Sequence, residues 1–174
     1  MKWHLDRYYV MHLLLQCLSA TAFMWLILMG LDQVVSSQLI WAAGASTLAS
    51  SAFIVFVLPD AIVAKPFKII GSYLIAMGCG AAIRGLAMAV CAIFPQCTAG
   101  IPHSHLFEIA AAVAVGLSLL VMVLCRSEHP PAAGLAVVMV LDIRTPIALV
   151  IILAGAIILA MIRFIFRRKL LNLV

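Results

Sequence analysis

The sequence predicts an all-α membrane protein, and two observations lead to that prediction. Of its 174 residues, 67% are hydrophobic and only 10% are charged, whereas a soluble domain carries roughly 25% charged residues. The apolar residues are gathered into stretches of about 20 residues, the length that an α-helix needs to cross a hydrocarbon core of about 30 Å. We therefore expect a single transmembrane domain over residues 1–174, in contact with the lipid bilayer.

Five apolar stretches are long enough to cross the bilayer as helices. They are Val10–Leu31, Leu39–Leu58, Phe67–Phe94, Leu106–Cys125 and Ile147–Phe166. A sixth segment, Pro131–Leu141, is too short to cross alone, and we expect a half-helix with an unwound approach. The expected fold therefore has about six helical segments, with short or broken helices at Gly44–Leu58 and Pro131–Leu141.

The basic residues indicate how these segments are oriented. If all six cross and both termini are cytoplasmic, only Arg144 among the loop cations lies outside. The cations inside are Lys2, Arg7, Lys65, Lys68, Arg126, Arg167, Arg168 and Lys169. This bias favours cytoplasmic termini in a bacterial inner (plasma) membrane. A four-crossing arrangement, with the second and fifth segments re-entrant, stays open, although it moves Lys65 and Lys68 outside.

The two halves of the chain share an order of landmarks. The first half reads Gly44-Ala45-Ser46-Thr47, Asp60, Lys65-Pro66 and Arg84. The second reads His129-Pro130-Pro131-Ala132-Ala133-Gly134, Asp142, Arg144-Thr145-Pro146 and Arg163. Three crossings in each half require opposite orientations, so we expect two inverted repeats, at about 1–95 and about 104–174. Secondary transporters recurrently use inverted repeats with interrupted helices; chance similarity of apolar sequence is the alternative.

A polar interruption, Arg126-Ser127-Glu128-His129-Pro130-Pro131, separates two strongly apolar stretches. Broken helix at membrane depth needs shelter from protein or water, and ionisable residues there are functional candidates. Two prolines suit a first helical turn, where a missing N–H is not lost. Because helix N-termini attract anions, we expect a small-anion site where this segment start faces its counterpart in the first half.

The expected binding residues come from both halves. They are Gly44, Ala45, Ser46, Thr47, Arg84, Arg126, His129, Pro130, Pro131, Ala132, Ala133 and Gly134. His129 can carry a proton, and so donate to the anion or couple its passage to a proton; the alternatives are that it caps the half-helix or marks a membrane-surface loop. Arg84 needs a cavity or a partner such as Glu108 or Glu128, unless it reaches the membrane surface.

The landmarks resemble those of the HPP family of small integral membrane proteins. They are Gly44-Ala45-Ser46, Pro59, Lys65-Pro66, Gly71 and Arg126-x-x-His129-Pro130-Pro131-Ala132-Ala133, and the match covers about Trp41 to Leu141. Plant plastid and cyanobacterial members are regarded as nitrite transporters. The sequence departs from the family at Lys65-Pro66-Phe67-Lys68, where Gln-Pro-Arg-Asn is expected, and at Ala132-Ala133-Gly134. The resemblance implies the fold and suggests a nitrite-like substrate.

The leading expectation is a channel or secondary transporter for a small monovalent anion, not an enzyme, with no cofactor and no nucleic-acid partner. The alternatives are an intramembrane metal-dependent protein and a structural or sensory membrane protein. The metal alternative depends on Cys91, Cys97, His103, His105 and Glu108, whose spacing fits no strong metal pattern. Charge pairs are expected at segment boundaries, Arg126 with Glu128, Asp60 with Lys65 and Asp142 with Arg144. Small residues at helix contacts also leave a homo-oligomer open.

Overall fold

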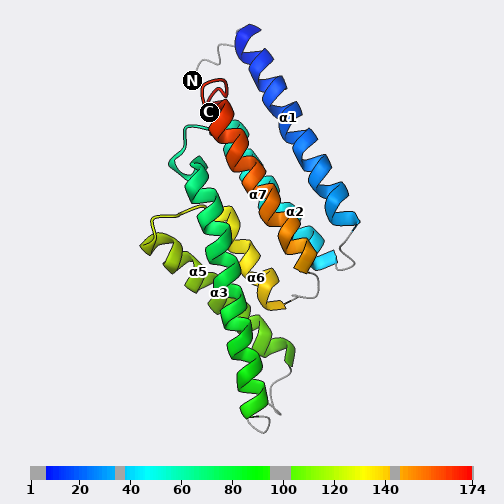
Figure 1. Ribbon diagram of the computed structural model, residues 1–174, viewed down its shortest axis with the longest axis vertical. Coiled ribbons are helices and arrows are strands. Elements are labelled where there is room, and N and C mark those ends of the chain that lie inside the picture. The colour runs from blue at the N-terminus through cyan, green and yellow to red at the C-terminus, as the bar shows by residue number, and fades with distance from the viewer. Residues whose placement is uncertain (1–6, 34–37, 95–102, 142–145, 174) are drawn as a thin grey trace.

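The computed structural model describes residues 7–33, 38–94, 103–141 and 146–173, and within them it is built from helices (Figure 1). The helices are α1 (Arg7–Asp32), α2 (Gln38–Val57), α3 (Pro66–Ile93), α5 (His103–Leu124), α6 (Gly134–Leu141) and α7 (Pro146–Phe166), with 3₁₀ turns η1 (Ile62–Ala64) and η2 (Pro130–Ala133). Four of them, α1, α3, α5 and α7, are long and apolar enough to cross a membrane. The prediction of an all-α membrane protein is confirmed.

The start of α2 differs from the sequence expectation. The helix begins at Gln38, so Gly44–Thr47 lies in its second and third turns and is not a helix start. A lone glycine inside a helix costs only about 1 kcal/mol relative to alanine, and no proline precedes it here. A Cβ atom at Gly44 would lie 2.6 Å from Cδ1 of Ile152 on α7. The glycine therefore permits close packing of α2 on α7.

The end of α5 shows how the polar interruption begins. The N–H of Ser127 donates to the carbonyl of Met122 at 2.8 Å, and that of Arg126 donates to Val123 at 3.0 Å. Arg126 has a φ of 52°, in the left-handed region. This pair of hydrogen bonds around a left-handed residue is a Schellman cap, which usually places glycine where Arg126 stands. The interruption thus starts as a helix C-cap.

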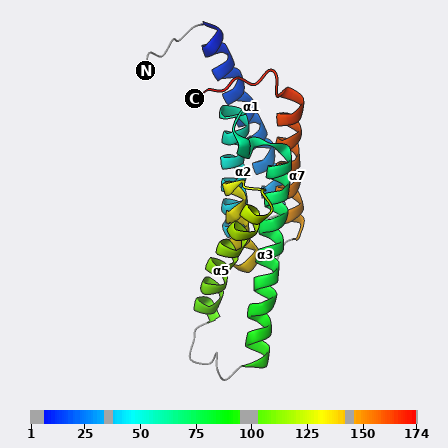
Figure 2. The ribbon, with the colours of Figure 1, turned by 90° about the vertical axis from the view of Figure 1, so that its left-hand side faces the viewer.

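The short helix α6 lies at the centre of the bundle, packed against α2, α3 and α5 (Figure 1). Its buried side chains are Leu135, Ala136, Val138, Met139 and Val140. With 8 residues it spans about 12 Å, too little to cross a membrane alone. The start of α1 and the end of α7 lie at one end of the molecule. At the other end, α3 and α5 extend past the remaining helices (Figure 2).

The segment after α7 is hydrogen-bonded to α1 and α2. The side chain of Gln16 on α1 is buried, and its Nε2 donates to the carbonyls of Phe56 and of Leu171, the latter at 3.0 Å. Its Oε1 accepts from the N–H of Leu171 at 3.2 Å. The N–H of Leu173 donates to Val57 at 3.0 Å. Polar groups that the end of α2 leaves free are in this way satisfied by a segment far along the chain.

The charge pairs at the segment boundaries differ from those expected. Glu128 pairs with Lys68 in the first turn of α3, and not with Arg126. Asp60 lies 3.9 Å from Nη2 of Arg163 on α7, and not beside Lys65. Both acidic residues therefore pair with a basic residue that is distant in sequence, and not with the nearby basic residue that the sequence suggested. The expected pair of Asp142 and Arg144 lies outside the described residues.

Candidate functional site

His129 is fully buried, between α2, α3 and η1. Its Nδ1 lies 2.8 Å from the carbonyl oxygen of Val63, and its Nε2 lies 2.8 Å from Oγ of Ser51. A carbonyl oxygen can only accept, so Nδ1 carries a hydrogen and donates it to Val63. The side chain makes no capping bond to η2, which follows it. His129 is thus the N-cap residue of η2 by position, and its backbone carbonyl accepts from the N–H of Ala132, while its side chain bonds other segments.

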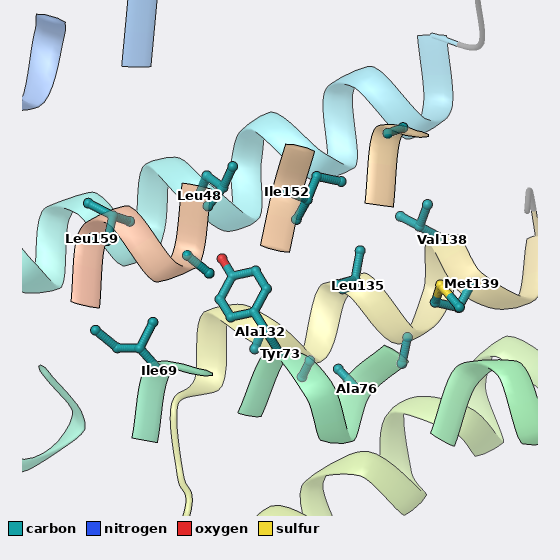
Figure 3. Packing of buried hydrophobic residues seen from close by; sticks show 14 of the residues in the cluster. Leu48, Ile69, Tyr73, Ala76, Ala132, Leu135, Val138, Met139, Ile152 and Leu159 are labelled. Atoms are coloured by element: carbon teal, nitrogen blue, oxygen red, sulfur yellow. The ribbon is translucent and has the colours of Figure 1, made fainter. Parts of the chain in front are cut away.

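Ser51 connects His129 to Tyr73, which is also fully buried. The two hydroxyl oxygens lie 2.9 Å apart, and Ser51 Oγ additionally lies 2.9 Å from the carbonyl of Thr47. Figure 3 shows Tyr73 reaching from α3 through the apolar core with its hydroxyl toward α2. Ser51, Tyr73 and His129 form what we call the buried cluster, a set of hydrogen-bonding groups enclosed by hydrocarbon.

Sequence reasoning missed two members of this cluster. Ser51 lies one helical turn after Thr47, on the same face of α2, since residues four apart on a helix are neighbours. Tyr73 lies two turns into α3 from Pro66. Each puts a hydroxyl on the buried side of a largely apolar helix. Following the face of α2 that carries Thr47 would have found Ser51, whereas the sequence does not indicate that Tyr73 lies beside it.

The two predicted segments do meet, but not by their N-termini. A Cβ atom at Gly134 would lie 3.1 Å from Cγ2 of Thr47, and Ser51 bonds His129. Because later residues of α2 meet earlier residues of the second segment, the two run antiparallel. The contact therefore joins the middle of α2 to the start of η2, and the expectation of facing half-helix N-termini is wrong.

The first turn of η2 has few donors for an anion. Pro130 and Pro131 lack N–H groups, and the N–H of Ala132 donates to the carbonyl of His129 at 3.0 Å. Ala132 and Ala133 are buried and small, so that η2 packs closely on its neighbours. The hydrogen-bonding capacity here belongs to the side chains of the buried cluster.

A groove open to the surroundings lies beside the buried cluster. It is lined by Ala49, Ser50, Phe53, Ile54, Pro130 and Pro131. Ser50 and Pro130 immediately adjoin Ser51 and His129 in sequence, so the groove and the cluster share the same two backbone segments. Ser46, one turn before Ser50, is exposed and bonds its own helix, at the carbonyl of Ala43, as buried Thr47 does at Gly44. Gly44 and Ala45 are buried in the helix packing.

The two predicted arginines lie away from the buried cluster. Nη1 of Arg84 donates to the carbonyl of Val140 at 2.5 Å, and its guanidinium carbon lies 5.8 Å from the ring centre of Phe107. Arg84 thus occupies the carboxyl end of α6, opposite the end that His129 precedes. Arg126 is exposed in the Schellman cap. Neither Glu108 nor Glu128 is the partner of Arg84, since they pair with His105 and Lys68.

Burial controls the electrostatics of His129. It lowers the pKa of the imidazole below the ordinary value of 6.5, and the hydrogen bond to Val63 opposes this lowering. A neutral His129 is therefore the favoured form near neutral pH. Beside it, hydrogen bonding from Lys68 lowers the pKa of Glu128, so that this carboxylate stays charged.

The residues of the metal alternative are only partly described. His105 and Glu108 are exposed and lie 3.1 Å apart as a pair within α5. Cys97 lies outside the described residues, and nothing is described of the His103 side chain. Among the described residues, no group of three or more His, Cys, Asp or Glu side chains is placed to hold a metal ion.

The comparisons with known proteins give one match. The family model for the HPP transmembrane region matches residues 6–171, nearly the whole chain. The comparisons with curated proteins and with solved structures give no match. The match is broader than the landmarks on which the resemblance was first drawn, since it includes α1 and α7.

Proposed function

Since the chain belongs to the HPP transmembrane-region family, we propose that it is a membrane transport protein that passes a small monovalent anion, as a channel or secondary transporter and not as an enzyme. Nitrite is the first substrate to test, because the family members that the sequence resembles include those regarded as nitrite transporters. The observation that carries the proposal is the buried cluster of Ser51, Tyr73 and His129 beside an open groove.

The chemistry of the cluster favours an anion over a cation. A protonated imidazole carries a positive charge, which attracts a small oxyanion and repels a cation. Cation sites in membranes are built from carboxylates or carbonyl oxygens. None of the described carboxylates belongs to the cluster. Asp32 lies at the end of α1 and Asp60 near Arg163, while Glu108 is paired with His105 and Glu128 with Lys68.

The shelter around the cluster suits a transport site. Polar groups are expensive in hydrocarbon unless protein or water satisfies them. Here α2, α3 and η1 satisfy them, and the small residues Ala132, Ala133 and Gly134 hold the backbone of the second segment close to α2. We propose that an anion enters the groove and is attracted there by the positive charge that His129 carries when it is protonated. This arrangement replaces the two facing helix ends that the sequence suggested.

The inverted repeat is part of the same proposal. Helix α2 packs on α1 and α7, and α6 packs on α5 and α3, as expected when α1, α2 and α3 correspond to α5, α6 and α7. Arg163 lies beyond the carboxyl end of α2, near Asp60, while Arg84 lies at the carboxyl end of α6. Each arginine thus lies near the carboxyl end of the middle helix of the other half, Arg163 near that of α2 and Arg84 at that of α6. Sites at the interface of such repeats are typical of secondary transporters.

We propose cytoplasmic termini in a bacterial inner membrane. In support, the pair of Lys68 with Glu128 joins the first turn of α3 to the segment after α5, so the cations expected inside from these two segments lie on the same part of the bundle. Cysteines introduced near Asp32 and Ala99 should then react with an impermeant reagent from outside. An external C-terminus would contradict this arrangement. A homo-oligomer is a further proposal, tested by the mass of the detergent-solubilised protein.

Flux into proteoliposomes tests the transport function. Nitrite and other small anions should enter vesicles that contain the protein faster than protein-free vesicles. His129→Gln, which keeps a hydrogen-bonding side chain, should slow the entry at least about tenfold, because a glutamine cannot carry the imidazolium charge. His105→Ala, at an exposed histidine, is the matched control and should transport normally. Uptake equal to that of empty vesicles for every anion would end the proposal.

A further inference from the structure

The hydroxyl of Ser51 lies between two acceptors that its single hydrogen cannot serve together. Its Oγ is 2.8 Å from Nε2 of His129 and 2.9 Å from the carbonyl oxygen of Thr47. A third neighbour, the hydroxyl of Tyr73, is 2.9 Å away. A serine hydroxyl has one hydrogen to donate and two lone pairs that accept. Ser51 therefore has two alternative hydrogen-bonding arrangements.

In the first arrangement His129 is neutral. Nδ1 carries a hydrogen because it faces the carbonyl of Val63, so Nε2 is the accepting nitrogen. Ser51 donates its hydrogen to Nε2 and accepts from the hydroxyl of Tyr73. Every member of the buried cluster then has a partner.

In the second arrangement His129 carries a second proton, on Nε2. That N–H donates to Ser51 Oγ, and the hydrogen of Ser51 turns to the carbonyl of Thr47, which already lies at hydrogen-bond distance. Ser51 still accepts from Tyr73, so both of its lone pairs and its hydrogen are used. No heavy atom has to move between the two arrangements.

We propose that Ser51 makes His129 a reversible proton-binding site, and that the protein carries one proton together with each anion. The inference rests on the proposed anion transport and names its coupling ion. A proton from the solution on one side forms the Nε2–H bond, and the same bond breaks when the proton leaves toward the other side. The O–H bond of Ser51 only rotates and never breaks.

The anion and the proton favour each other's binding. A negative ion in the groove beside Pro130 and Pro131 raises the proton affinity of His129, because an opposite charge stabilises the imidazolium. By linkage, protonation raises the affinity for the anion by the same factor. When both are bound, the charge of the imidazolium and the charge of the anion cancel, which lowers the free-energy cost of carrying either charge through hydrocarbon.

Few titratable groups surround His129 in the described residues. From α3 there are Tyr73, which bonds Ser51, and Lys68, which is paired with Glu128. On the loops Lys65 and Arg126 are exposed, and Asp60, which precedes η1, is paired with Arg163 of α7. The cluster-facing residues of α2, Thr47 and Ser51, have no ionisable side chain, and the described α6 has none along its length. The charge at the cluster is therefore decided by His129 itself.

Nitrogen NMR of the full-length protein in lipid nanodiscs tests the proton site directly. With ¹⁵N-labelled histidine, the signals that vanish in His129→Gln belong to His129. We expect the neutral form to carry its hydrogen on Nδ1, and Nε2 to take up a proton as the pH falls. Ser51→Ala should weaken this proton affinity about tenfold, since the imidazolium loses a charge-assisted hydrogen bond. Ser19→Ala is the matched control and should leave it unchanged, because Ser19 is an exposed serine of α1 that bonds the carbonyl of Leu15 in its own helix.

Anion flux under an imposed proton gradient tests the coupling. An inward gradient should accelerate anion entry through the unaltered protein and through Ser19→Ala, after subtraction of the entry into empty vesicles. Ser51→Ala should lose most of the acceleration. If that variant fails to fold, Ser51→Cys, whose thiol is a weaker acceptor, should show an intermediate loss in both measurements.

The outcomes separate the two proposals. Anion flux that ignores the gradient, or a His129 proton affinity that is the same in Ser51→Ala, would overturn the coupling and leave anion transport standing. Absence of flux for every anion, with and without a gradient, would overturn the proposed function and the coupling with it. A neutral His129 with its hydrogen on Nε2 would overturn the two arrangements of Ser51.

Discussion

The guanidinium of Arg84 on α3 donates a hydrogen bond to the carbonyl oxygen of Val140, 2.5 Å away, near the carboxyl end of α6. The last four carbonyls of a helix have no partner within it. In α6, which has 8 residues, these are half of the helix. Arg84 also lies over the ring of Phe107, which joins α5 to the same contact. One cation therefore holds three helices together.

Replacing Arg84 with alanine should destabilise the protein by about 2 kcal/mol, because a hydrogen bond to a charged group is lost and a buried carbonyl is left without its partner. Arg84→Lys should recover part of this, since it keeps the charge but not the planar donors. Unfolding in mixed detergent micelles measures the loss. An Arg84→Ala protein that is fully stable and yet transports no anion would instead place Arg84 on the anion path.

A methyl group added at Gly80 should be costly. Its Cβ atom would lie 2.5 Å from Cβ of Met139 and 2.8 Å from the carbonyl oxygen of Ala136, where backbone cannot give way. Overpacking of this kind costs about 1–3 kcal/mol and pushes α6 away from α3. Gly78→Ala is the matched control, since nothing lies within 4 Å of its Cβ position. Equal melting temperatures for the two variants would refute the packing of α6 on α3.

Glycine at position 126 should stabilise the protein by about 1 kcal/mol, because a left-handed backbone penalises any residue with a Cβ atom. Arg126→Val should have the opposite effect, since a β-branched residue fits that conformation worst. Thermal unfolding in detergent distinguishes the two. Transport should survive Arg126→Gly; a loss of anion flux in a stabilised Arg126→Gly protein would show that the arginine binds the anion.

The stability of the protein should fall as the pH drops below about 6.5, because of His129. Its pKa is lower in the folded protein than its ordinary value of 6.5. At higher pH both the folded and unfolded histidine are neutral, and below 6.5 the unfolded chain binds the proton first, which favours unfolding. Melting temperatures at about pH 7.5 and about pH 5.5 measure the effect, which His129→Gln should reduce. Glu128 contributes in another range, as its stabilisation is lost only when the pH falls below 4.5.

Helix positions were largely predictable from the sequence, because hydropathy reports directly on burial in lipid. The apolar stretches Phe67–Phe94 and Ile147–Phe166 match α3 and α7 to within one residue at each end. The start of α2 was not predictable, since Gly44 suggests an interruption although its role is close packing against Ile152. Local sequence cannot distinguish a glycine that breaks a helix from one that another helix approaches.

The candidate site was predictable in part. That the segments Gly44–Thr47 and His129–Gly134 meet follows from matching the two halves, although not by their N-termini, and His129 follows from the cost of an ionisable group between apolar stretches. The place of Arg84 could not be read in the same way. Arg84 lies 18 residues beyond Pro66, about 27 Å along α3. Its partner is the carbonyl of Val140, and that contact depends on how far α6 reaches into the bundle, which the sequence does not reveal. The site residues remain predictions until transport is measured.

The hydrogen bonds between Gln16 and Leu171 bear on the order in which the protein is assembled during synthesis. Gln16 and Leu171 are separated by 155 residues, so α1 enters the membrane long before its last hydrogen-bonding partner has been made. Until then, Gln16 can be satisfied by the carbonyl of Phe56, once α2 has followed. The newly inserted α1 is therefore held loosely while the later helices arrive, and these hydrogen bonds close the bundle only after the segment that follows α7 has been made.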